Sequence, residues 1–114
     1  MSVHPDAAHG PGVSRILEHV ADWERRSRDH LVLVGLIPAD AAVATGLITK
    51  VAARVRSAVE PELVERAHSA GMDVRATLRV KASAECDQLA KLTPFLTPRL
   101  YGRETFYALS DGEF

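Results

Sequence analysis

The sequence contains a single cysteine, Cys86, and only 5% of its 114 residues are aromatic. One cysteine cannot form an internal disulfide, and zinc sites that need two thiolates are excluded for the same reason. Hydrophobic residues nevertheless make up 46% of the chain, so its core must consist mostly of Ala, Val and Leu. A core of such small aliphatic side chains favours closely packed helices.

Long hydrophobic runs and an excess of basic charge are also missing. The longest apolar stretch covers residues 31–38, which is far too short to span a bilayer. The N-terminal residues MSVHPDAAHGPG have neither the basic start nor the apolar stretch of a signal peptide. The formal net charge of -1 argues against a protein that is strongly basic as a whole. We therefore expect a soluble, cytoplasmic protein that does not enter a membrane.

Catalytic motifs are absent as well. His30, His68, Cys86, Tyr101 and Tyr107 carry reactive groups, but none of them lies in a known nucleophile or metal motif. Cys86 is interpreted as a small core residue, because free cysteines are usually buried. The sequence therefore predicts that the protein is not an enzyme and that it binds no metal and no cofactor.

A chain of this length suits one compact domain. Residues 1–12 contain prolines and glycines but no apolar periodicity, which predicts a flexible N-terminal arm followed by a single domain over residues 13–114. A first helix should begin near Ser14. The apolar residues that recur there at helical spacing are Val13, Ile16, Leu17, Val20 and Ala21, and Trp23 extends the stripe. Because so small a chain has few other ways to cover this stripe, we expect a homodimer through the N-terminal helix.

Residues 39–61 predict a long amphipathic helix that ends before Pro61. Val43, Leu47, Val51, Val55 and Val59 fall at every fourth position. An alternative breaks this element at Gly46 into a helix-turn-helix. We favour one helix, because an isolated glycine costs a helix only about 1 kcal/mol. A short helix over residues 61–72 should follow, with Gly71 as its C-terminal stop.

Two segments leave the choice between strand and helix open. Residues 30–38, HLVLVGLIP, are compatible with a buried strand or with part of a buried helix. Residues 73–82 alternate between apolar and polar side chains, which favours a half-buried strand, although a short helix is also compatible. Ser83 should cap a further helix that places Cys86, Leu89 and Leu92 on one face.

The C-terminal third resembles the DNA-binding half of a winged helix-turn-helix, most of all that of the arsenic-repressor family of bacterial regulators. LRVKASAECDQLAKL is similar to the helix-turn-helix core, and RLYGRETFYALSD is similar to the β-hairpin wing with Gly102 and Arg103 at its tip. The paired cysteines of that family are missing, so metal sensing is not implied. Glu85 and Asp87 also place negative charge where phosphates would approach.

The resemblance implies a mainly α fold with a C-terminal β-hairpin, and a dimeric transcriptional regulator that binds double-stranded DNA. Ser83, Gln88 and Lys91 would face the groove, and Arg99, Tyr101 and Arg103 would contact the backbone. Lys50 and Arg54 would be additional phosphate contacts. The charge distribution agrees with this, since residues 47–103 carry a net charge of +4 and the rest of the chain about -5. An acidic protein partner would suit the same basic side.

The alternative fold is an α/β sandwich of the ferredoxin-like kind. Its strands would be Leu31 to Ile37, Val74 to Lys81 and Arg103 to Leu109, with the helices packed on one face of the sheet. The protein would then be a protein-interaction or small-ligand-binding module without catalysis, and the arginines would simply line the surface of the sheet.

Overall fold

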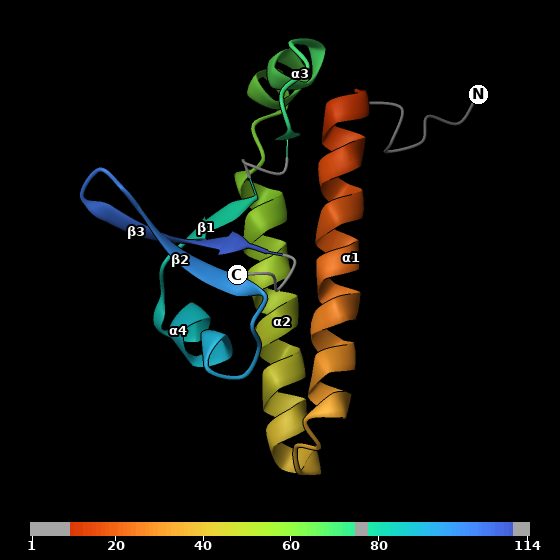
Figure 1. The fold of residues 1–114 in the computed structure, drawn as a ribbon, viewed down its shortest axis with the longest axis vertical. Coiled ribbons are helices and arrows are strands. Elements are labelled where there is room, and N and C mark those ends of the chain that lie inside the picture. The colour runs from red at the N-terminus through yellow and green to blue at the C-terminus, as the bar shows by residue number, and fades with distance from the viewer. Residues whose placement is uncertain (1–9, 75–77, 111–114) are drawn as a thin grey trace.

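The structure of the protein is a computed structural model that describes residues 10–74 and 78–110. It contains a long helical hairpin, a short third helix, and a small three-stranded sheet with one helix beside it (Figure 1). The elements in chain order are α1 (Pro11–Leu33), α2 (Pro38–Ala58), α3 (Pro61–Ser69), β1 (Arg79–Lys81), α4 (Ala84–Ala90), β2 (Leu96–Tyr101) and β3 (Glu104–Leu109). The prediction of a mainly α fold with a C-terminal β-hairpin is therefore confirmed.

Helix α1 begins earlier than predicted. Pro11 and Gly12 belong to its first turn, so the predicted arm over residues 1–12 is wrong in its last two residues, and residues 1–9 lie outside the described ranges. Proline favours this position because it has no N–H to leave unpaired. The N–H groups of Gly12 and Val13 each donate a hydrogen bond of 2.9 Å to the carboxylate of Glu65 in α3. This carboxylate fixes the start of α1 against α3.

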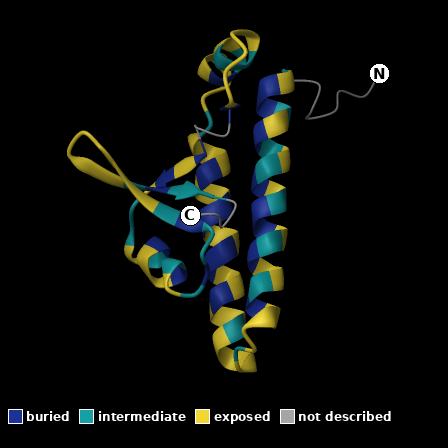
Figure 2. Cartoon of the chain, in the orientation of Figure 1, coloured by how far each residue is buried: buried dark blue, intermediate teal, exposed yellow. Residues whose placement is uncertain are grey.

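The apolar stripe of α1 is covered within the chain. Ile16, Val20 and Trp23 are at most 1% exposed, and α1 packs along α2 and α3 (Figure 2). The indole Nε1 of Trp23 donates a hydrogen bond of 2.8 Å to the carbonyl of Phe95. The expectation that this stripe forms a homodimer interface is therefore wrong in its premise, because α2 and α3 already occupy the space that a second copy would fill.

Residues 30–37 contain no strand. Residues 30–33 are the last turn of α1, and the chain then turns at Gly35, whose φ of 65° favours glycine, before α2 begins. Because the ferredoxin-like alternative requires a strand here, that alternative is wrong. The turn leaves Val32 and Leu33 each 83% exposed.

In the described part of the chain, no helix combines the length and the hydropathy that a membrane crossing requires.

Helix α2 runs through Gly46 without a break, so the one-helix prediction is confirmed and the helix-turn-helix at Gly46 is wrong. Its buried face consists of Ala44, Leu47, Ile48, Val51, Ala52 and Val55. Val43, in contrast, is 53% exposed, because it lies outside the contact with α1. Helix α3 ends at Ser69, and Gly71 follows with a φ of 77°, as expected for a C-terminal stop.

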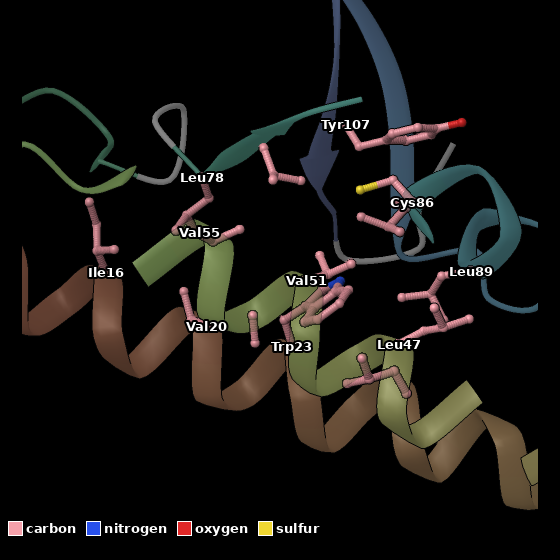
Figure 3. Close-up of a cluster of buried hydrophobic side chains, with 14 of the residues drawn as sticks. Ile16, Val20, Trp23, Leu47, Val51, Val55, Leu78, Cys86, Leu89 and Tyr107 are labelled. Atoms are coloured by element: carbon pink, nitrogen blue, oxygen red, sulfur yellow. The ribbon is translucent and has the colours of Figure 1, made fainter. Parts of the chain in front are cut away.

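The sheet has the antiparallel order β1-β3-β2, so that β3 is the central strand. The strand interpretation of residues 73–82 is confirmed for Arg79–Lys81, whereas residues 75–77 lie outside the described ranges. Alternation gives the sheet two faces. The inner face carries Val80, Leu96 and Tyr107, all at most 9% exposed. This face packs towards the helices, as Tyr107 shows in Figure 3. Cys86 and Leu89 of α4 complete this core at 0% exposure, which confirms the prediction for Cys86.

Candidate nucleic-acid interface

Strands β2 and β3 form a hairpin that projects from the helical body (Figure 1). Gly102 has a φ of 65° and lies with Arg103 between the two strands, so the predicted position of the turn is confirmed. A tight turn of this kind requires a positive φ that glycine adopts without strain. Arg103 is therefore held at the exposed tip of the hairpin.

The face of the sheet that points away from the core carries a cluster of cationic and aromatic side chains. We call it the outer sheet face. By strand register it consists of Arg79 and Lys81 of β1, Thr97, Arg99 and Tyr101 of β2, and Glu104, Phe106 and Ala108 of β3. Lys81 and Arg99 are both paired with Phe106, so one row across the sheet presents an aromatic ring between two cations.

The two aromatic rings of this face are in contact with each other and with an arginine. The rings of Tyr101 and Phe106 meet edge to face, with 5.4 Å between their centres and an angle of 83° between their planes. The guanidinium carbon of Arg79 lies 4.2 Å from the centre of the Tyr101 ring and 5.5 Å from that of Phe106. Cation–π attraction thus holds the guanidinium group over the middle of the outer sheet face.

The charge of the outer sheet face is mostly unpaired. Within the described residues, no carboxylate lies at ion-pair distance from Arg79, Arg99 or Arg103, whereas Lys81 lies 3.4 Å from Glu104. Arg99 and Arg103 are exposed to solvent. Three guanidinium groups without a partner carboxylate, on and beside one projecting hairpin, form a site that attracts phosphate or other oxyanions.

A groove continues the outer sheet face towards α3. It has a volume of about 370 Å³ and is lined by Ala58, Val59, Glu60, Leu63, Val64, Arg79, Val80, Lys81 and Phe106. Its lining is mostly apolar and includes two cationic side chains from β1, Arg79 and Lys81. The groove therefore combines a mostly hydrophobic lining with positive charge.

The predicted contacts on α2 and at the start of α4 are engaged within the chain. The hydroxyl of Ser83 accepts hydrogen bonds from the N–H of Cys86 at 3.2 Å and from Arg54 at 2.8 Å, so Ser83 caps α4 as predicted. Arg54 also forms an ion pair with Glu85, and the Nζ of Lys50 lies 3.6 Å from the same carboxylate. Glu85 thus neutralises much of the charge that Lys50 and Arg54 could offer to a phosphate.

Helix α4 lies on the other side of the sheet from the outer sheet face. The hydroxyl of Tyr107, on the inner face, donates a hydrogen bond of 2.7 Å to Asp87 in α4. Gln88 and Lys91 are exposed on this helix. The structure thus brings Arg99, Tyr101 and Arg103 together on the hairpin, but it separates them from Gln88 and Lys91.

The helix-turn-helix core is incomplete in the described residues. The resemblance places the first helix and the turn of that motif at residues 79–83. In the structure, residues 79–81 form strand β1, and residues 82 and 83 are not helical. Pairing with Phe106, Tyr107 and Ala108 of β3 stabilises the extended conformation of residues 79–81. What remains of the winged arrangement is one helix, α4, followed by a hairpin.

The hydrogen bond to Asp87 raises the pKa of Tyr107 from 10.0 to about 12, because ionisation would lose the bond and bring two negative charges together. Since the folded-state pKa lies above the unfolded one, this contribution to stability is complete below pH 10. It is lost as the pH rises from about 10 to about 12.

We expect the free energy of unfolding to fall less over this interval in Tyr107→Phe than in the wild type. Urea unfolding at a series of alkaline pH values measures this, and equal slopes for the two proteins would contradict the assignment.

Arg79, Lys81 and Phe106 belong to the outer sheet face, although they were not among the predicted site residues. The alternation in residues 73–82 was the available signal, because a strand there places Arg79 and Lys81 on one face. Their position beside Phe106 depends on the pairing of β1 with β3, which no local pattern specifies. Among the described residues, no three His, Cys, Asp or Glu side chains lie close enough together to hold a metal ion.

No protein-family model, no curated protein and no solved structure matches the chain.

Proposed function

We propose that this protein binds double-stranded DNA through the tip of the β2–β3 hairpin and the outer sheet face. The proposal rests on one observation: Arg79, Arg99 and Arg103 have no carboxylate partner in the described residues and lie on or beside the same projecting hairpin. Phosphate groups are the ligands that such an arrangement suits best, since guanidinium groups bind phosphate oxygens with two parallel hydrogen bonds.

The hairpin acts in the manner of a wing that follows the DNA backbone. Helix α4 precedes it in the chain but lies on the other side of the sheet, so Gln88 and Lys91 are not part of this interface. Glu85 and Asp87 on the same helix weaken an approach to phosphates, so we assign most of the binding energy to the hairpin. A role as a transcriptional regulator follows from the resemblance in the C-terminal third, and it requires sequence specificity in addition to backbone contact.

The test compares the wild type with the double variant Arg99→Ala/Arg103→Ala in binding to random duplex DNA at low salt. We expect the variant to bind about tenfold more weakly or worse. The slope of log affinity against log salt concentration should decrease by up to about 0.9 for each lost phosphate contact. Fluorescence anisotropy of a labelled duplex, measured over a range of salt concentrations, gives both quantities.

The matched control is Arg15→Ala/Arg66→Ala, which removes the same charge from exposed positions on α1 and α3. It should bind duplex DNA nearly as well as the wild type. If both double variants lose affinity equally, net charge rather than the hairpin explains the binding. If polyglutamate displaces DNA as well as unlabelled duplex does, the basic face serves an acidic protein partner instead.

A further inference from the structure

The outer sheet face carries more than charge. Phosphate binding requires only cations, but this face also holds the rings of Tyr101 and Phe106, and Tyr101 is 40% exposed. Tyr101 is exposed and Phe106 is half-buried. Aromatic rings that solvent reaches on a sheet, next to arginines, form a surface on which nucleobases stack. The guanidinium group of Arg79, held above both rings, provides a second surface of the same kind.

The adjoining groove has the size and the chemistry for one nucleobase. Its volume of about 370 Å³ is at the lower end of the range for ligand sites, which suits a single planar ring system. Val59, Leu63 and Phe106 provide apolar lining, while Arg79 and Lys81 line the same groove and can bind the phosphate attached to the base. Glu60 also lines the groove, and a carboxylate there can accept a hydrogen bond from the amino group of cytosine or adenine.

Bases in a duplex cannot use these features, because they are stacked on their neighbours and paired. We propose that the outer sheet face and its groove bind unpaired nucleotides, with the base against Phe106 and Leu63 and the phosphates on Arg79 and Lys81. The inference rests on the proposed DNA binding by the hairpin and specifies the form of the ligand. Single-stranded DNA, or an unpaired base beside a duplex, is then the preferred ligand over duplex alone.

The experiment measures the binding of a short labelled strand of alternating dA and dC, and of the duplex that it forms with its complement, at one salt concentration. We expect the wild type to bind the strand about tenfold more tightly than the duplex, because stacking of one or two bases provides a gain in affinity of that size. Leu63→Ser removes an apolar wall at a residue that is 51% exposed, so folding is preserved. It should weaken strand binding about fivefold and leave duplex binding unchanged.

Leu33→Ser is the matched control, because it makes the same change at an exposed leucine at the C-terminal end of α1. It should alter neither affinity. Tyr101→Ala should weaken strand binding by a factor similar to that of Leu63→Ser. Equal affinity of the wild type for strand and duplex would overturn the inference. Equal effects of Leu63→Ser and Leu33→Ser on strand binding would overturn it as well. In both cases the proposed duplex binding by the hairpin would remain. Absence of salt-dependent binding to either ligand would instead refute the proposed function.

Discussion

Replacing Trp23 with alanine should lower the free energy of unfolding by about 3–5 kcal/mol, the range measured for large aromatic side chains in protein cores. The side chain is 1% exposed and lies where α1 meets α2, below the sheet (Figure 3). The variant also leaves the carbonyl of Phe95 without its 2.8 Å hydrogen bond. Domains of this size are stabilised by only about 5–15 kcal/mol, so the variant should lose a large part of its stability. Urea denaturation followed by circular dichroism measures the loss.

Two further variants of α1 show which interactions of Trp23 account for the loss of unfolding free energy. Trp23→Phe keeps an aromatic ring but no donor, and it should cost less than Trp23→Ala. Ser27→Ala serves as the matched control, since the hydroxyl of Ser27 is fully buried and has no hydrogen-bond partner among the described residues. Its removal should be neutral or slightly stabilising. A loss below about 1 kcal/mol for Trp23→Ala would contradict the burial of this side chain.

Glu65→Ala should be the next most damaging change, with an expected loss of about 2–3 kcal/mol. The carboxylate accepts hydrogen bonds from the N–H groups of Gly12 and Val13 at the positive end of α1. Alanine leaves both partly buried donors without this acceptor and releases α3 from α1. Thermal and urea unfolding measure the effect, and Glu65→Gln should recover part of the stability because its amide oxygen accepts one bond.

Glu62→Ala is the control for this prediction, because Glu62 is an exposed carboxylate in the first turn of the same helix. Its loss should cost less than about 1 kcal/mol, the usual size of an interaction with a helix dipole. Equal effects of Glu62→Ala and Glu65→Ala would show that charge on α3, rather than the contact with α1, stabilises the protein.

Local patterns predicted the elements that local interactions determine. The helical spacing of apolar residues located α1 and α2, and Ser83 marked the start of α4 because its side chain caps a neighbouring N–H. Gly102 located the turn of the hairpin, because few other residues adopt its positive φ. Each of these signals acts within a few residues, so a single sequence is sufficient to detect it.

Long-range packing decided what those patterns left open. Residues 31–37 are compatible with a strand or a helix by local pattern, and in the structure they form the end of α1 and a turn, with Leu31 buried. The stripe of α1 was correctly identified, but its partner is the same chain rather than a second copy.

The sequence by itself determined the helices, the hairpin turn, the cap at Ser83 and the burial of Cys86, because propensity and periodicity act along the chain. Only the tertiary structure decided which cations remain available to a ligand. It pairs Lys50 and Arg54 with Glu85, a residue far away in sequence, and it places Arg79 over Tyr101 through strand pairing. The physical reason is that ion pairs and strand registers join distant residues, and their energies exist only once the chain has folded.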